Sequence, residues 1–241
     1  MAAYKLFTLS AIPSLHASWQ DYLNLTKPRV ISLLLLTTLC AMLIAGGQGH
    51  STEIILLTLL GGYLAAGGAG AINCYLDRDI DEVMVRTRRR PIPAQRITPD
   101  QALRFGVMLS VLAFVLLGLG VNWLTAGLAM AGNLCYVFVY TYWLKRRSPQ
   151  NIVIGGAAGA FPPLVGWAAA TGKLTPLAWV LFAIIFLWTP PHFWALTLAR
   201  RSEYARAGVP MLPVVAGERT TQRQIVIYTL LLVLTTLLPV F

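Results

Sequence analysis

Four of the nine acidic residues in this 241-residue chain lie close together, at Asp77, Asp79, Asp81 and Glu82. Asn73 precedes them, so that Asn73, Asp77 and Asp81 stand at i, i+4 and i+8. On an α-helix these three side chains share one face, within an arc of about 80°. Oxygen ligands without histidine or cysteine suit Mg²⁺, which proteins usually hold through carboxylates while a substrate's phosphates complete the shell. The spacing therefore predicts a site for Mg²⁺ and a diphosphate.

Two basic clusters accompany the acidic segment. They consist of Arg86, Arg88, Arg89, Arg90 and Arg96, and of Lys145, Arg146 and Arg147. A departing diphosphate needs such cations to neutralise its negative charge, and one arginine can hydrogen-bond two phosphate oxygens at once. In the alternative interpretation the acids belong to a solvated helix end and pair with Arg78, Arg86 or Arg88, while the basic residues only set topology or contact anionic lipids.

An aromatic stretch precedes the second basic cluster. It contains Tyr136, Phe138, Tyr140, Tyr142 and Trp143. The faces of such rings stabilise cations, so the stretch is suited to an allylic cation formed when a diphosphate departs. Tyr142 and Trp143 also fit the aromatic belt found where spans end.

The elements that must position these residues are membrane helices. Hydrophobic residues make up 57% of the chain and charged residues 12%, and the mean hydropathy is +0.67. Soluble domains carry about 25% charged residues, which excludes a soluble globular enzyme. A membrane-spanning helix needs about 20 apolar residues. Seven runs qualify, at about 30–47, 54–72, 105–122, 123–143, 152–171, 176–199 and 225–241. We expect a single all-α, polytopic membrane domain over residues 1–241.

The basic residues lie on one side of these spans. Of the 19 lysines and arginines, 18 precede the first run or fall at 73–104, 144–151 and 200–224, and only Lys173 lies on the other side. Under the positive-inside rule the N-terminus and the long loops are cytoplasmic. Because the charges are confined to gaps between apolar runs, the net charge of +10 indicates contact with the bilayer rather than with nucleic acid. The three cysteines form no CxxC pair and predict neither a disulfide framework nor a cysteine metal site.

Two spans carry proline pairs, Pro162-Pro163 and Pro190-Pro191. Proline removes a helical hydrogen bond, so each pair should kink its helix around a central pocket inside the membrane. His192 follows the second pair, about 12 Å from the cytoplasmic edge of a regular helix. It is either a functional group or a neutral histidine bonded to a carbonyl that the prolines release.

Four motifs in order carry a resemblance to a known family. They occupy 73–94, 140–159, 188–196 and 203–213. From about residue 24 onward the chain resembles the protohaem IX farnesyltransferases, or haem O synthases, of the UbiA-type intramembrane prenyltransferases. Those proteins usually have nine spans, so the seven counted here suggest a chain that lacks the last helices of the family.

The resemblance implies that a farnesyl group passes from farnesyl diphosphate to the 2-vinyl group of haem B, with addition of water. The product is haem O for terminal oxidases. It implies Mg²⁺ on Asn73, Asp77 and Asp81, and catalytic roles for these three with Lys145 and Arg146. The implied substrate-binding residues are Arg78, Arg86, Arg90, Arg147, Asn151, His192, Arg200, Glu203 and Tyr204. The segment from His192 to Tyr204 stands where the superfamily has a second aspartate-rich motif. A bacterial inner membrane and a haem A synthase or haem-delivery partner are also implied.

Two other functions are also compatible with the sequence. One is a UbiA-type prenyltransferase that acts on another aromatic acceptor. The other is a haem transporter or assembly protein, because broken helices and buried histidines occur in such proteins too. The second alternative predicts no chemistry and little effect of Asp77→Asn on haem binding.

Overall fold

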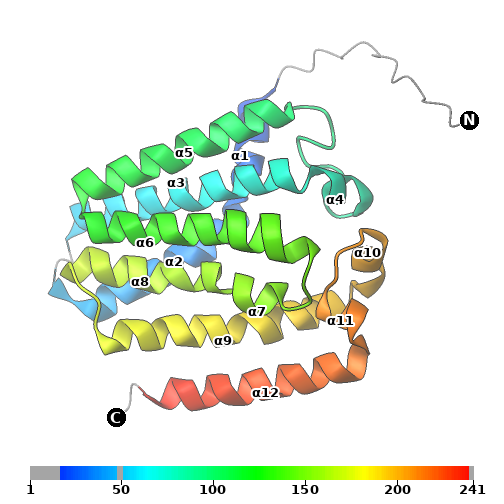
Figure 1. The fold of residues 1–241 in the computed structure, drawn as a ribbon. Helices are drawn as coiled ribbons and strands as arrows, with labels where there is room; N and C mark the ends of the chain where they lie inside the picture. Colours follow the sequence, from blue (N-terminus) through cyan, green and yellow to red (C-terminus); the bar gives the residue numbers. More distant parts are fainter. Residues whose placement is uncertain (1–16, 48–50, 239–241) are drawn as a thin grey trace, which may run out of the picture.

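The computed structural model describes residues 17–47 and 51–238. Within these ranges every regular element is a helix, which confirms the predicted all-α fold. The long helices lie side by side as a bundle (Figure 1). Short turns connect them at one end, and the short helices α4 (Arg78–Val83), α10 (Arg201–Arg206) and α11 (Leu212–Val215) gather at the other. We call the second end the loop end.

Six helical segments of the described chain are long and apolar enough to cross a membrane. They are α2 (Pro28–Ala45), α3 (Thr52–Leu76), α5 (Pro99–Gly120), the continuous run of α6 (Trp123–Leu134), η2 (Cys135–Trp143) and η3 (Leu144–Arg146), the pair α7 (Asn151–Gly155) and α8 (Ala157–Thr171), and α9 (Pro176–Leu198). The chain is therefore a multi-pass membrane protein, and six of the seven predicted spans are confirmed.

The seventh predicted span, 225–241, falls in α12 (Gly217–Leu237) and partly outside the described residues. The first two turns of α12 are polar, with the sequence GERTTQRQ over 217–224. The apolar stretch that follows within the described helix is shorter than the roughly 20 residues that a crossing needs. The predicted count of seven is thus one more than the described helices support.

Glycines allow the central helices to approach one another closely. A Cβ atom on Gly68 of α3 would lie 2.6 Å from the carbonyl oxygen of Gly106 on α5. A Cβ on Gly106 would lie 2.8 Å from the carbonyl oxygen of Gly68. In lipid, helices associate through such close packing because burial of apolar surface gives little net gain. The crossing fixes α3, which carries Asn73 near its C-terminal end, within the bundle.

The fifth span is interrupted at a glycine rather than at its prolines. Pro162 and Pro163 lie inside α8, and Pro190 and Pro191 lie inside α9, yet both helices continue past them. The interruption separates α7 from α8 at Gly156, where an added Cβ would lie 2.9 Å from the Cγ2 atom of Thr189 on α9. Helices α8 and α9 thus run through their proline pairs, the kinks expected there stay a prediction, and the one interruption of the fifth span lies at Gly156, where α9 approaches closely.

An apolar cluster holds the loop end together. Its buried members are Ile80, Met84, Ile152, Val209 and Met211, and Tyr140 and Tyr204 pack against it. These residues come from α4 and the loop after it, from η2 and α7, and from the segment that follows α9. The cluster therefore packs the acidic segment against the later loop that contains Glu203 and Tyr204.

Candidate functional site

The acidic segment crosses a helix junction. Helix α3 ends at Leu76, and Asp77 stands between it and α4 with φ −92° and ψ 7°. The Asp77 N–H still donates to the Asn73 carbonyl (2.9 Å), and the Asp81 N–H donates to the Asp77 carbonyl (2.8 Å). The predicted i, i+4, i+8 register thus survives the junction. Asn73, Asp77 and Asp81 are all buried, with 3%, 1% and 2% of their surfaces exposed.

Asp77 lies at the centre of a polar network. Lys145 Nζ and Asn73 Nδ2 both donate to Asp77 Oδ2, at 2.5 and 2.7 Å. Asp77 Oδ1 is buried and accepts no hydrogen bond, and Arg146 Nη2 lies 4.0 Å from it. A buried carboxylate needs compensating cations, and the tertiary structure supplies Lys145 from η3. Asp77 therefore keeps one oxygen free for a further ligand.

The other acids pair with arginines. Arg90 Nη1 donates to both oxygens of Asp81, at 2.9 and 2.7 Å. Burial alone would lower the pKa of Arg90, but the ion pair with Asp81, together with Cys74 and Tyr136, raises it. Arg146 donates two hydrogen bonds of 2.6 Å to Asp79 and lowers the pKa of that carboxyl to about 2. The acids do pair with basic residues, but not with Arg78, Arg86 or Arg88 as the alternative interpretation held.

Lys27 is a site residue that sequence reasoning missed. It adopts a left-handed conformation (φ 61°) immediately before α2. Its Nζ donates to Asn73 Oδ1 at 2.5 Å and lies 5.8 Å from the centre of the Tyr136 ring. In the sequence Lys27 counted only toward membrane topology. The one local signal for the position of Lys27 is Pro28. Proline favours the first turn of a helix, so it predicts that α2 starts there and that Lys27 directly precedes the helix.

The aromatic stretch forms η2, a π-helix. Its wide turn lets Thr141 Oγ1 donate to the Tyr136 carbonyl (2.8 Å) while accepting a hydrogen bond from Asn73 Nδ2 (3.0 Å). Tyr136 and Tyr140 stack with their ring centres 5.6 Å apart, and Tyr136 faces Lys27. Phe138, Tyr142 and Trp143 are instead exposed on the outer surface. Only part of the predicted aromatic stretch therefore borders the acidic site, as the π-helix turns successive rings apart.

The oxygen donors at this site fit a hard cation such as Mg²⁺. Asp77 Oδ1 is the buried carboxylate oxygen that lacks a partner, and Asp81 and Asn73 lie in register with it. Arg90 donates hydrogen bonds to both oxygens of Asp81, and Lys27 donates one to the amide oxygen of Asn73. In the described part of the chain no group of three or more histidine, cysteine, aspartate or glutamate residues converges. The candidate ligand set thus consists of two carboxylates and one amide.

The remaining predicted residues are distributed along the loop end. Asn151 is fully buried at the start of α7, and neither its Nδ2 nor its Oδ1 has a partner. Glu203 Oε2 on α10 is likewise buried and unpartnered. Arg86 and Arg200 are exposed. Tyr204 packs against the apolar cluster described above.

His192 does not point into the bundle. It is exposed on α9 and stacks on Trp188, with ring centres 4.3 Å apart. Pro191 and Trp194 on either side of it are buried. Helical periodicity directs these neighbours inward and His192 outward. The expectation of a buried histidine beside a central pocket is wrong for the described structure, in which an apolar hollow of about 410 Å³ lies instead among α3, α5, α6 and η2.

Curated relatives are similar over most of this chain. A protein named protoheme IX farnesyltransferase from Thermosynechococcus vestitus is 59% identical over 92% of this chain and 70% of its own length. One of the same name from Gloeobacter violaceus is 60% identical over 94% of this chain and 74% of its length. A third, from Roseiflexus sp. strain RS-1, is 62% identical over 91% of this chain, which spans only 41% of that relative.

Solved structures show the same fold. A UbiA homolog from Archaeoglobus fulgidus bound to GPP and Mg²⁺ matches with a TM-score of 0.73 at 18% identity, over 89% of this chain and 76% of that one. A digeranylgeranylglyceryl phosphate synthase matches with a TM-score of 0.74 at 21% identity, over 91% of this chain and 76% of its own. The model of the UbiA prenyltransferase family matches residues 34–241. Fold, motif order and family match agree, and the chain belongs to the UbiA prenyltransferase family.

Proposed function

We propose that this chain transfers the farnesyl group of farnesyl diphosphate to the 2-vinyl group of haem B and forms haem O. The names of the relatives support the choice of substrates. The observation that carries the chemistry is Asp77, a buried carboxylate that Lys145 neutralises on one oxygen and that keeps the other oxygen free. Such a group is costly inside a membrane protein and is expected to serve a ligand.

The diphosphate binds where the cations converge on Asp77. Lys145 Nζ and the Arg146 guanidinium both lie beside that carboxylate, and Lys27 reaches the same place through Asn73. Mg²⁺ would be held by Asp77 with Asp81 and Asn73, and when bound it neutralises charge on the diphosphate. The lysines and arginine donate to the leaving oxygens and stabilise the charge that develops as the carbon–oxygen bond breaks.

The bond electrons leave with the diphosphate, and the farnesyl group becomes an allylic cation. The terminal carbon of the haem vinyl group attacks this cation, and water captures the new cation beside the porphyrin and releases one proton. Because an alkene is the nucleophile, the bond-forming step needs no protein base. The stacked rings of Tyr136 and Tyr140 present faces suited to the allylic cation. Burial of the site keeps water away until the carbon–carbon bond has formed.

Haem binding is assigned to the later loop and the end of α9. Glu203, Tyr204 and Asn151 lie at the loop end, where two of them have buried polar atoms without partners. Arg200 and Arg86 are exposed there and suit the propionates. His192 would contact haem from the outer face of α9. The proposal also places the protein in a bacterial inner membrane with the loop end cytoplasmic, beside a haem A synthase or a haem-delivery protein.

The test is a mass-resolved chromatogram of haems after purified protein is incubated with haem B, farnesyl diphosphate and Mg²⁺. Wild type is expected to form haem O. Asp77→Asn is expected to lower the rate by about 100-fold or more, because the variant loses a carboxylate that would hold the Mg²⁺ needed to neutralise the departing diphosphate. Asp100→Asn is the matched control, since Asp100 is exposed in the first turn of α5.

Other outcomes separate the alternatives. Haem binding without product would favour a haem-handling protein. Prenylation of an aromatic acid in place of haem would identify another acceptor. Equal rates for the Asp77 and Asp100 variants would contradict the assigned site.

A further inference from the structure

Two adjoining hollows lie outside the acidic site. The apolar hollow described above, of about 410 Å³, is lined by residues of α3, α5, α6 and η2. A polar hollow of about 420 Å³ is lined by Leu76, Arg78, Asp79, Tyr142, Arg146 and Arg147. Leu76 and Tyr142 line both hollows, so the two adjoin. We call the pair the joined hollow, with an apolar part and a cationic part.

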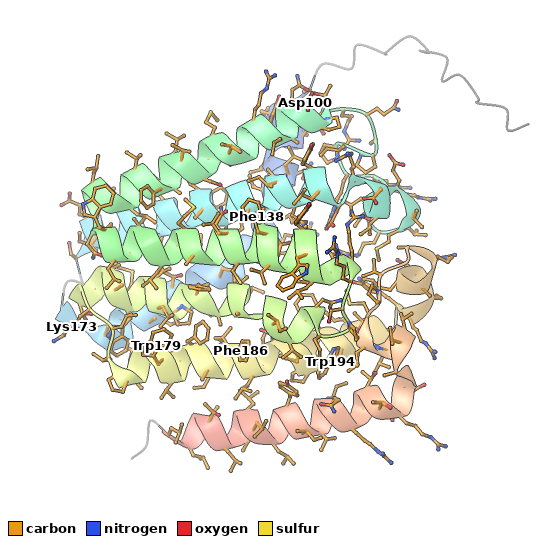
Figure 2. The ribbon with its side chains drawn as sticks, viewed as in Figure 1. Asp100, Phe138, Lys173, Trp179, Phe186 and Trp194 are labelled. Carbon is orange, nitrogen blue, oxygen red and sulfur yellow. The ribbon has the colours of Figure 1, made fainter. Side chains whose placement is uncertain are left out.

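The apolar part follows the bundle into the membrane. Leu103 and Val111 line it from two turns of α5, about 12 Å apart along the helix. Phe138 lines the opposite side and, like Val111, is more than half exposed, at 58% and 55%. Figure 2 shows Phe138 at the middle of the bundle rather than at an end. The hollow is thus open to hydrocarbon along a length suited to part of an acyl chain.

The polar part carries a net positive charge. Its three arginines face one acid, Asp79, and Arg146 already binds both oxygens of that acid. The Arg78 guanidinium lies 4.9 Å from the centre of the Tyr75 ring and donates to the Tyr75 carbonyl. Arg147 is exposed and makes no ion pair among the residues that the structure describes. Two guanidinium groups therefore remain available to an anion.

This hollow borders the acidic site at Arg146 but does not contain the candidate metal ligands. Asn73, Asp77, Asp81 and Lys145 line neither part of it. Its one carboxylate is occupied by Arg146, so it offers no free oxygen to a metal-bound diphosphate. Its polar part lies at the loop end, at the depth where lipid headgroups meet a membrane protein.

We infer that the joined hollow binds one anionic glycerophospholipid of the bilayer. The phosphate lies against Arg147 and Arg78, and one acyl chain lies in the apolar part between α5 and η2. Arginine suits this role because its planar group pairs with two phosphate oxygens. Charge complementarity selects an anionic over a zwitterionic lipid, and the open apolar side leaves the second chain in the membrane.

The experiment is native mass spectrometry of the full chain in detergent with added phosphatidylglycerol or with phosphatidylcholine of the same acyl chains. Phosphatidylglycerol is expected to bind about tenfold more tightly. Arg147→Gln should reduce its binding about tenfold, the equivalent of one charge-assisted hydrogen bond. Arg219→Gln is the matched control, because Arg219 is exposed on α12 far from the hollow in sequence.

A second pair of variants tests the apolar part. Val107 lines the hollow and is 47% exposed, whereas Val115, two turns along α5, is 45% exposed and does not line it. Val107→Trp should fill the hollow and reduce lipid binding about tenfold, while Val115→Trp should leave binding unchanged. Equal effects of the two tryptophans would overturn the proposal.

The remaining outcomes are equally decisive. Equal binding of the two lipids would show that the arginines do not select a charge and would overturn the inference. Displacement of phosphatidylglycerol by farnesyl diphosphate with Mg²⁺ would assign the hollow to the prenyl substrate and overturn it as well. Asp77→Asn should leave lipid binding intact, so a failure of the proposed reaction is distinguishable from a failure of this inference.

Discussion

Two lysines lie against the oxygens that are candidates to bind a metal. Lys145 contacts Asp77 Oδ2, and Lys27 contacts Asn73 Oδ1. A cation that binds these oxygens must compete with the ammonium groups, whereas a diphosphate that arrives with it attracts them. The same lysines are thus expected to oppose the metal alone and to favour the metal together with diphosphate.

Lys27→Met separates these two effects. The variant is expected to bind Mg²⁺ alone several-fold more tightly, because a competing charge is gone, and to bind Mg²⁺ with inorganic diphosphate several-fold more weakly. Isothermal titration of the purified protein measures both affinities. Arg29→Met is the control, since Arg29 is exposed in the same turn. Changes of the same sign in both titrations would contradict this role.

The Arg146–Asp79 pair predicts a pH dependence. Its carboxyl pKa of about 2 lies below the ordinary value of about 3.9. Because the pKa is depressed in the folded protein, the pair contributes its full stability above the ordinary value and loses it as the pH falls through about 2. The contribution is small, since both side chains are partly exposed. Carboxyl NMR titration should give a low midpoint for Asp79, and Arg146→Gln should return it to the ordinary range. An unchanged midpoint in the variant would count against the pair.

At the scale of the elements, the positions of the site residues depend on contacts between helices more than on the helix propensity of each segment. Helix α3 is held against α5 by reciprocal glycines, and η2 winds as a π-helix where Thr141 reaches Asn73. The apolar runs in the sequence predict that these helices exist, because period and length are local properties. They do not predict which faces touch.

The glycine contact predicts an asymmetry between two alanine substitutions. Gly68→Ala adds a Cβ 2.6 Å from the Gly106 carbonyl and should cost about 1–3 kcal/mol, because two backbones must move apart. Gly127→Ala on α6 adds a Cβ with no atom within 4 Å and should be neutral or slightly stabilising. Thermal unfolding in detergent compares the two. Equal melting temperatures would show that the α3–α5 contact is looser than described.

At the scale of the whole molecule, the bundle has two chemically different ends. Figure 2 shows Lys173 at the end opposite Asp100. The acidic segment, η3 and α10 lie with Asp100 at the loop end, where the basic loops predicted to be cytoplasmic gather. The charge asymmetry read from the sequence therefore coincides with a structural asymmetry.

The two ends predict opposite accessibility. In a variant whose three cysteines are replaced, Lys173→Cys and Arg206→Cys each add one exposed thiol, at opposite ends of the bundle. A membrane-impermeant maleimide should label Lys173→Cys only from the outer side of sealed vesicles and Arg206→Cys only from the cytoplasmic side. Labelling of both from one side would contradict the predicted orientation.

The sequence by itself determined the all-α membrane fold, six of the spans, the family, and the register of Asn73, Asp77 and Asp81. These follow from hydropathy, charge asymmetry and short spacing, which act between residues near in sequence. Only the tertiary structure decided that Lys145 contacts Asp77 and that Lys27 contacts Asn73. It also decided that Arg90 pairs with Asp81 and Arg146 with Asp79, and that His192 faces outward. Those outcomes depend on which helix faces pack together, and packing is set by side chains that lie far apart along the chain.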